Sequence, residues 1–341
     1  MSRNTNRVWR LVSRPKGRFN KENFKFSEEK IPIPGEGDVK VRTLYVSLDP
    51  THRIWMSNID QYMPPIELGE VIRSGSLGVV EESRSSKYNI GDIVVGLWGW
   101  QDYSVVKEDK IRYKVVQNPK IPITAWMSVL GSTGITAWIG LHLVNFKPKD
   151  TVLINSAAGA VGQVATQLAK NKGCNVIGIA GSNDKCKWLL NEAKINTALN
   201  YKQERNIFIQ EFDAACSDGI DVLFENVGGD LLDLSLTKLN VFSRIALCGL
   251  ISEYNSIDKS TGPKMFRNLL MKRVMLRGFI VSDHIELWDI ARKEISELIL
   301  KNKLKWREDI ISGLEKAPEA LHKIFDGKNE GKLMIKVSEL D

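Results

Sequence analysis

A strand, a glycine-containing turn and a helix follow one another directly between residues 151 and 173, and this succession constrains the fold more than any other feature. The run TVLINSA (151–157) is apolar throughout, as expected of a strand buried on both faces. The next run, VGQVATQLAKNKG (161–173), has a helical period and stops at Gly173. Its apolar face consists of Val161, Val164, Ala165, Leu168 and Ala169. A strand that passes directly into such a helix predicts a βαβ unit in a parallel sheet.

The rest of the chain shows two textures. The runs NVIGIAG, DVLFENV and RIALCGLI repeat the strand pattern, with helical segments between them, and residues 284–303 are predicted to form a helix. Residues 125–303 are therefore predicted to form a doubly wound, Rossmann-type α/β domain. Residues 1–124 carry short β-like runs separated by turns, typical of a small barrel or sandwich. The end of the chain, GKLMIKVSEL, returns to the β texture and is expected to rejoin this first domain.

The turn itself, NSAAGAVGQ, has the composition of a phosphate-binding loop. Gly159 allows a close approach of the backbone to a pyrophosphate, and Gly162 allows the helix to pack near the strand. The start of the helix then offers N–H donors and the positive end of its dipole. Ala157 stands where the strict GxGxxG pattern has its first glycine, so a purely structural tight turn stays an alternative.

The acidic residue expected about 20 positions after such a loop is missing. Its place holds Gly181 and Ser182, followed by Lys185. A carboxylate there would bind the ribose hydroxyls of NAD, whereas small residues leave room for the 2′-phosphate of NADP and a lysine attracts it. The alternative is an ordinary surface lysine at a helix start. Because a lysine there opposes the helix dipole, we favour NADPH.

Charge and cysteine usage exclude several classes. Of the net charge of +7, all lies in residues 1–25, with eight Lys or Arg and one Glu, and the remainder carries 40 basic and 40 acidic residues. Without an interleaved aromatic pattern, we expect this segment to be the solvated face of an edge strand and not a nucleic-acid site. The four cysteines lack CxxC spacing, which favours reduced thiols and a cytoplasmic protein. No apolar run is long enough to cross a membrane.

Together these stretches resemble the zinc-independent medium-chain dehydrogenase/reductase superfamily, specifically its prostaglandin reductase, leukotriene B4 dehydrogenase and alkenal double-bond reductase group. The resemblance covers nearly the whole chain and rests on YVSLDP (45–50), GLWGWQDY (96–103), LGSTGITAWIGL (130–141), AAGAVG (157–162), GSNDK (181–185), NYK (200–202), ENVGG (225–229), CGLISEYN (248–255) and GKNEGKLMIKV (327–337). It implies a GroES-like catalytic domain formed by residues 1–124 and 304–341, and a Rossmann NADP-binding domain between them.

The resemblance also implies site residues. Carried over by position, the cofactor-binding residues are Gly159, Ala160, Val161, Gly162, Lys185, Tyr201, Asn226, Cys248, Gly249, Leu250, Ile251, Ser252, Tyr254, Phe279, Ile280, Val281 and Asn329. Tyr254 is the candidate catalytic residue, since the group places a tyrosine hydroxyl beside the nicotinamide ribose and the substrate carbonyl. A ribose anchor that transfers no proton is the alternative role.

The chain departs from its group at residues 49–53, where many relatives read DPYMR and this chain reads DPTHR. The missing aromatic weakens the transfer of a substrate preference. Tyr62, Trp100 and Tyr103 are candidates to replace that pocket wall, although aromatic residues in strands usually only pack. His52 is either a pH-sensitive group or a turn histidine without a role.

The metal ligands of the zinc-dependent relatives are also missing. Their Gly-His-Glu element corresponds to Leu68–Val71, which has no histidine, and no cysteine precedes Cys174. A metal-free site disfavours alcohol oxidation and favours reduction of a conjugated alkene. We therefore expect a homodimeric NADPH-dependent reductase of α,β-unsaturated aldehydes and ketones. An NADPH:quinone reductase, or a catalytically idle NADPH- or RNA-binding protein, are the alternatives.

Overall fold

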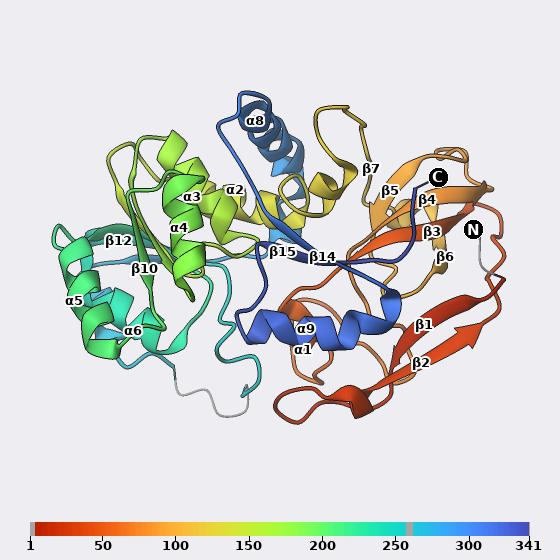
Figure 1. Cartoon of the computed structure of the whole chain (residues 1–341), viewed down its shortest axis with the longest axis horizontal. Helices are drawn as coiled ribbons and strands as arrows, with labels where there is room; N and C mark the ends of the chain where they lie inside the picture. The colour runs from red at the N-terminus through yellow and green to blue at the C-terminus, as the bar shows by residue number, and fades with distance from the viewer. Residues whose placement is uncertain (1–3, 257–261, 341) are drawn as a thin grey trace. The chain divides into compact units, whose positions relative to one another are not determined.

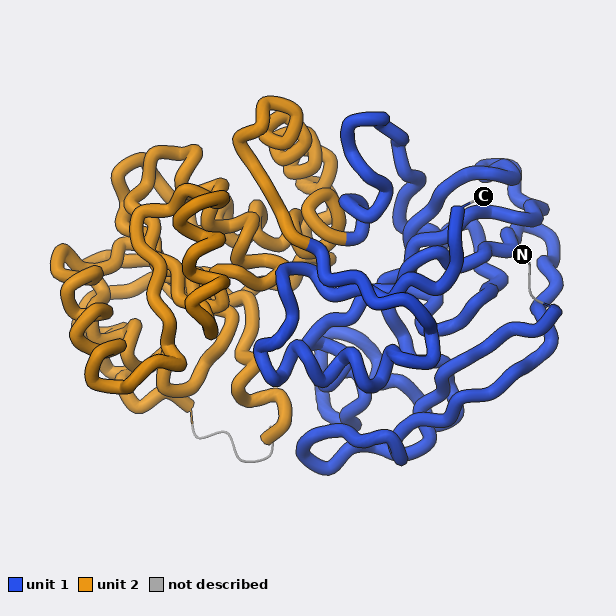
Figure 2. Tube along the Cα trace, viewed as in Figure 1, with its two compact units in different colours: residues 1–127, 308–341 blue, residues 128–307 orange. Residues whose placement is uncertain are grey.

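The computed structural model describes residues 4–256 and 262–340. The chain divides into two compact units, Met1–Met127 with Glu308–Asp341 and Ser128–Arg307 (Figure 2). The division falls after residues 127 and 307, a few residues beyond the predicted boundaries at 124 and 303. Both ends of the chain thus belong to one unit.

The unit Ser128–Arg307 contains, within its described residues, a six-stranded parallel sheet (Figure 1). In spatial order its strands are β10 (Thr197–Asn200), β9 (Asn175–Ala180), β8 (Thr151–Ile154), β11 (Ile220–Glu225), β12 (Leu239–Leu247) and β13 (Met275–Gly278). The helices are α2 (Ser132–Leu143), α3 (Gly162–Asn171), α4 (Asn183–Asn191), α5 (Arg205–Ala215), α6 (Gly229–Thr237), α7 (Arg267–Met271) and α8 (Trp288–Leu300). The predicted Rossmann-type α/β domain is confirmed.

Strand β8 at the centre of this sheet is buried on both faces, which explains why its run TVLI is apolar. Leu153 and Leu223 pack in one core cluster with Phe208 and Phe212 of α5. Side chains alternate along a strand, so Val152 points to the opposite face, where it is also fully buried. This burial on two sides is the property that the run TVLI signals in the sequence.

The predicted helix at 284–303 is shorter than expected. Residues Val281–Leu287 form a 3-10 segment that is kinked at His284, and α8 covers only Trp288–Leu300. The chain then leaves the helix, because the amides of Gln163, Gln167 and Asn171 on α3 bond to the backbone between residues 303 and 307. A tertiary contact of this kind leaves no trace in the helical period.

The other unit is β-rich. Within its described residues the main sheet runs in the order β14 (Glu308–Ser312), β15 (Lys332–Lys336), β3 (Asp38–Ser47), β4 (Ser76–Ser83), β5 (Ile93–Gly96) and β7 (Tyr113–Lys114), with β6 (Tyr103–Lys107) also on β3. The hairpin of β1 (Asn6–Leu11) and β2 (Phe24–Glu29) and the helices α1 (Thr51–Trp55) and α9 (Ala317–Phe325) complete it. Pairing of β15 with β3 agrees with the expected return of the C-terminal segment.

The basic N-terminal segment is not simply a solvated strand face, so this prediction is wrong for β1. Arg7 is 8% exposed, and its Nε and Nη2 atoms donate to the two carboxylate oxygens of Asp102 at 2.8 and 2.9 Å. Arg10 makes a similar two-point contact with Glu29. The periodicity of the strand could not reveal Asp102, which lies far away in the sequence. Residues 1–3 of the segment lie outside the described residues.

Candidate active site

The predicted phosphate loop connects β8 to α3. A Cβ atom added at Gly162 would lie 2.2 Å from the Ser156 carbonyl oxygen, so no larger residue fits at the start of α3. A Cβ added at Gly159 would lie 2.9 Å from Ser156 Oγ. Gly159, Ala160 and Val161 are half-buried, which leaves part of the loop accessible at the helix start. The loop therefore has the close turn and the helix N-terminus that a pyrophosphate site requires.

A second group of predicted residues gathers at the end of β9. Ser182 caps α4, its Oγ accepting a hydrogen bond from the backbone N–H of Lys185 at 3.3 Å. A Cβ added at Gly181 would lie 3.2 Å from Tyr201 Cε1 and 3.4 Å from Lys202 Cε. Small residues at 181 and 182 thus lie beside the two side chains after β10, and Lys185 stands one turn into α4. Burial raises the pKa of Tyr201, whose hydroxyl is therefore neutral.

Lys202 lies beside Gly181 and Tyr201 as well, although it was not among the predicted site residues. Its Nζ lies 5.8 Å from the centre of the Tyr201 ring. The residue directly follows Tyr201 in the run NYK, so a search for a second cation next to the predicted phosphate contact would have found it. Two lysines and a tyrosine hydroxyl form a suitable set of donors for a phosphate group.

A pocket of about 390 Å³ opens at the carboxyl ends of β12 and β13. Its lining consists of Leu247, Cys248, Gly249, Leu250, Tyr254, Gly278, Phe279, Ile280 and Asp283. Six of these were predicted as cofactor-binding residues, and Leu247, Gly278 and Asp283 were not. Three predicted neighbours lie outside the lining: the backbone N–H of Ile251 bonds to Asn226 O, Ser252 Oγ bonds to Val227 O, and Val281 O accepts from Trp288 Nε1.

Tyr254 lies half-buried in this lining and turns back on its own loop. Its hydroxyl oxygen accepts a hydrogen bond from the Leu250 N–H at 3.3 Å. A Cβ added at Gly249 would lie 3.1 Å from the same oxygen, so the glycine gives the hydroxyl its space. The hydroxyl is thus held at the pocket wall, a place that suits either a proton donor or a ribose anchor.

Cys248 also lines the pocket, but its thiol has little reactivity. Burial, with a smaller contribution from the neighbouring Glu225 carboxyl, raises the pKa of the thiol to about 12. The thiolate, not the thiol, is the nucleophile and the metal ligand, so Cys248 contributes shape and not chemistry at neutral pH.

The predicted substrate wall is corrected in the other unit. Trp100 is 0% exposed and Tyr103 is 2% exposed, both packed into the interior of the β-rich unit. Neither offers open surface to a substrate, so these two predictions are wrong. Tyr62 is 42% exposed, and its hydroxyl accepts from Trp55 Nε1 at 2.8 Å. Tyr62 alone remains a candidate for the wall.

Asn329 lies in the loop before β15. Its Nδ2 donates to the Gly331 carbonyl at 2.8 Å, so the side chain stabilises its own turn. Contact of Asn329 with a cofactor stays a prediction.

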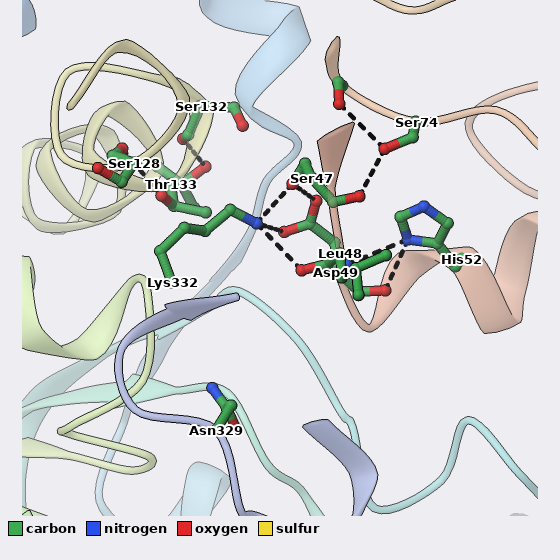
Figure 3. A network of polar contacts seen from close by, with 12 residues as sticks. Ser47, Leu48, Asp49, His52, Ser74, Ser128, Ser132, Thr133, Asn329 and Lys332 are labelled. Carbon is green, nitrogen blue, oxygen red and sulfur yellow. Dashed lines mark hydrogen bonds and ion pairs between the residues drawn. The ribbon is translucent and has the colours of Figure 1, made fainter. Parts of the chain in front are cut away.

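A polar network that sequence reasoning missed lies where β3 ends and β15 begins (Figure 3). Lys332 is 1% exposed, and its Nζ donates to Ser47 Oγ at 2.5 Å, to Leu48 O at 3.1 Å and to Asp49 Oδ1 at 2.5 Å. Burial alone would raise the pKa of Asp49, but the attraction of Lys332 and His52 and the hydrogen bonds from Lys332 and Ser47 together outweigh it and lower that pKa. The pair ties two distant segments together, and no local pattern in GKLMIKV indicates that this lysine is buried.

His52 borders the same network. It is 0% exposed, and burial lowers the pKa of its ring to about 4, against a weaker opposite effect of Asp49. Its Nδ1 lies 2.8 Å from Asp49 O, whereas Nε2 has no partner within the described part of the chain. The residue is therefore neither a solvated turn histidine nor charged near neutral pH.

Within residues 4–256 and 262–340, no group of three or more His, Cys, Asp or Glu side chains is arranged to hold a metal ion. In the same described ranges, every helix is too short or too polar to cross a membrane.

A Rossmann sheet with a glycine-containing loop between β8 and α3 and a pocket at the carboxyl ends of its strands is typical of dinucleotide-dependent oxidoreductases. Family models agree: "N-terminal domain of oxidoreductase" matches residues 7–113 and "Zinc-binding dehydrogenase" matches residues 160–298. The chain is 38% identical to an NADPH-dependent curcumin reductase of Escherichia coli, over 98% of this chain and 97% of that protein. It is 37% identical to a 2-alkenal reductase (NADP(+)-dependent) of Nicotiana tabacum, over 91% and 90%.

The solved structures agree with the relatives. CurA from Vibrio vulnificus in complex with NADPH superposes with a TM-score of 0.91 at 34% identity, over 98% of this chain and 100% of that chain. The chain belongs to the medium-chain dehydrogenase/reductase superfamily, in the family of NADP-dependent alkenal, curcumin and prostaglandin reductases.

Proposed function

We propose that the protein uses NADPH to reduce the carbon–carbon double bond of α,β-unsaturated aldehydes and ketones, leaving the carbonyl group intact. The observation that carries this proposal is the pocket beside Tyr254 at the edge of a Rossmann sheet, in a chain 37% identical to a 2-alkenal reductase over 91% of its length. The phosphate loop at Gly159–Gly162 supports the cofactor half of the proposal.

The proposed preference for NADPH over NADH rests on the residues that follow the end of β9. Gly181 and Ser182 replace the acidic residue that would repel a 2′-phosphate. Tyr201 and Lys202 lie beside Gly181, and Lys185 follows in the first turn of α4, whose cap is Ser182. A charge-assisted contact to phosphate is roughly twice as strong as a neutral hydrogen bond, so a single lysine is enough to give a measurable preference.

The proposed reaction needs few catalytic side chains, because the cofactor supplies the hydride. Bound NADPH supplies the hydride, which forms the new C–H bond at the β-carbon while the alkene electron pair moves toward the carbonyl oxygen. The chain must then hold the enone, meet the charge that develops on the oxygen, and allow a proton to reach the α-carbon. Tyr254, with its hydroxyl held by Leu250 N–H, is the residue we assign to this end of the pocket, as proton donor or ribose anchor.

We propose that the reaction is independent of zinc. The segment Leu68–Val71 has no histidine and no cysteine precedes Cys174, so the cysteine and histidine ligands of the zinc-dependent relatives are missing at these positions. The purified protein should contain far less than one zinc per chain, and chelators should leave its activity unchanged. Stoichiometric zinc whose removal abolishes turnover would contradict this part of the proposal.

We also propose a homodimer formed through the edge strand β13. Within the described residues β13 pairs only with β12, so its outer edge carries unpaired backbone groups. Large apolar side chains are exposed on and around it: Val241, Phe242, Leu270, Met271, Met275 and Leu276. An exposed apolar edge strand is a template for strand addition, and a second copy of β13 would continue the sheet.

The four free cysteines agree with a reducing compartment such as the cytoplasm, which stays a prediction.

Product analysis tests the reaction. A 2-alkenal or aryl-substituted enone should give the saturated carbonyl compound, with label from NADPH at the β-carbon and solvent hydrogen at the α-carbon. An allylic alcohol as product would contradict the proposal, because it would show reduction of the carbonyl group and not of the double bond. NADPH consumption with quinones alone would replace it with an NADPH:quinone reductase, and binding without turnover of any substrate would indicate an idle NADPH-binding protein.

A further inference from the structure

Glu225, a residue with no assigned role, lies at the carboxyl end of β11 and is 0% exposed. Its Oε1 accepts hydrogen bonds from the Val227 N–H at 2.6 Å and the Gly228 N–H at 2.8 Å. Its Oε2 accepts from Asn155 Nδ2 at 2.6 Å. One carboxyl group thus holds the turn into α6 and the first residue of the phosphate loop.

The backbone of Glu225 reaches a third segment. Its carbonyl oxygen accepts from the N–H groups of Cys248 at 2.9 Å and Gly249 at 3.1 Å, the residues that line the pocket. The neighbouring Asn226 donates through Nδ2 to the Asn155 carbonyl at 2.8 Å. The ends of β8, β11 and β12 are therefore tied together around one buried side chain, at the edge where cofactors bind in such sheets.

Burying a carboxyl group in this space costs free energy, because the charged form loses its contact with water. Burial raises the pKa of Glu225, against the hydrogen bonds that it accepts. An apolar side chain of similar size would avoid that cost but would leave two backbone N–H groups and the Asn155 amide without acceptors. A carboxyl group that persists in such a place serves the arrangement of the loops around it.

We propose that Glu225 is a positioning residue for the cofactor: through Asn155, Val227 and Gly228 it fixes the geometry of the phosphate loop and of the pocket beside Tyr254. The Glu225 carboxyl bonds to Asn155, Val227 and Gly228, and its removal weakens NADPH binding through the loops that these residues hold. This inference rests on the NADPH site proposed above and is independent of the enone.

The central experiment exchanges the two partners. Asn155→Asp places two carboxyl groups against each other and should weaken NADPH binding about tenfold or more at pH 8. Adding Glu225→Gln restores a donor and an acceptor in the reverse order, so the double variant should recover most of the lost affinity. Glu225→Gln alone should bind close to wild type, since Asn155 Oδ1, which has no partner within the described residues, then turns to accept from the new amide.

The measurement is the Kd for NADPH by titration, with the enone KM and kcat at saturating NADPH measured separately. Glu225→Ala should raise the Kd for NADPH about tenfold or more and leave kcat within a few-fold of wild type. Glu319→Ala, at an exposed position on α9, is the matched control and should change neither. Thermal unfolding of every variant separates lost folding from lost binding.

Two outcomes would overturn the proposal: wild-type NADPH affinity in Glu225→Ala, or no recovery in the exchanged pair relative to Asn155→Asp. If the wild-type protein itself failed to bind NADPH, the proposed function would fail first. Normal NADPH binding without enone turnover would contradict the substrate proposal alone and leave the test of Glu225 intact.

Discussion

The methyl group of Ala157 fills the space in front of Gly178. A Cβ atom added at Gly178 would lie 2.8 Å from the Ala157 Cβ, and the backbone N–H of Ala157 donates to Ile179 O at 2.8 Å. The loop and β9 approach each other closely, and here the glycine that permits this stands on the strand. This arrangement explains how the loop folds although its first fingerprint position holds an alanine.

This relationship predicts a compensating pair. Gly178→Ala should lower the free energy of unfolding by about 1–3 kcal/mol, because overpacking a buried site has a cost of that size. Ala157→Gly in the same chain should restore part of the loss, because Ile195 Cδ1 also lies 2.8 Å from the added Cβ. Urea unfolding measures both, with Gly278→Ala as control because nothing lies within 4 Å of its added Cβ. An uncompensated double variant would contradict the explanation.

Lys185 should decide between the two nicotinamide cofactors. Lys185→Ala should weaken NADPH binding by about 1.5–3 kcal/mol and hardly change NADH binding, since only NADPH carries the 2′-phosphate. Titration with both cofactors is the measurement. Lys187→Ala is a matched control on the same helix, because that exposed lysine pairs with Asp184. Equal losses for NADPH and NADH would show that Lys185 does not contact the phosphate.

These two sites mark what the sequence could and could not predict. The strand–turn–helix succession is local, so its period and composition predicted the parallel sheet. Of the residues beside Gly181, Tyr201 was predicted only through the family resemblance and Lys202 was not predicted. The contact between Ala157 and Gly178 joins the phosphate loop to β9, and the hydrogen bonds of Glu225 join three loops. Contacts of this kind depend on the packed structure and have no local pattern.

The burial of the aromatic residues was also not predictable from the sequence. Trp100 and Tyr62 both lie in bends outside the strands, yet one is buried in the core and the other is exposed. Composition predicts that an aromatic side chain packs against its neighbours. It does not predict whether an aromatic residue in an irregular segment points into the core or toward solvent. The buried Lys332 is a still harder case, because its partners Ser47 and Asp49 lie at the opposite end of the chain.

His52 should make stability depend on pH. Burial lowers the pKa of its ring from 6.5 to about 4, so the unfolded chain binds the proton first as the pH falls. The stability that the neutral ring contributes is complete above pH 6.5 and is lost as the pH falls toward about 4, by roughly 3 kcal/mol. Asp49 and Lys332 face the ring, and Asp49, with its lowered pKa, titrates only at more acidic pH.

The measurement is the urea midpoint at pH 7 and pH 5 for the wild type and His52→Leu. The leucine variant should lose less stability between these pH values, whatever its stability at pH 7. A similar loss in both proteins would mean that other groups cause the acid sensitivity.

Leu276 should control assembly if the second copy binds at β13. Leu276 is 44% exposed on this edge strand, and Leu276→Lys would place a charge in the proposed interface. Light scattering after size exclusion should give a dimer for the wild type and a monomer for this variant. Ile33→Lys, at an 81% exposed position of the β-rich unit, should stay dimeric. A monomeric wild type, or a dimeric Leu276→Lys, would exclude this interface.

The role of Tyr254 is open to a direct decision. The hydroxyl oxygen is held by the Leu250 N–H at the pocket wall, so Tyr254→Phe removes one polar atom and keeps the ring. If this hydroxyl donates the proton, kcat for enone reduction should fall by about 10²–10⁴, the usual range for general acid catalysis. The pH profile of the wild type should then show the ionisation of this acid, and the profile of the variant should lack it.

If the hydroxyl only anchors the ribose, the loss should appear mainly as a higher KM for NADPH, with kcat within a few-fold of wild type. Tyr88→Phe, a half-buried tyrosine of the β-rich unit, controls for the loss of any hydroxyl. Label from NADPH should still reach the β-carbon in both cases, because the reaction class does not depend on which role Tyr254 has. Unchanged kcat and unchanged KM together would remove Tyr254 from the site.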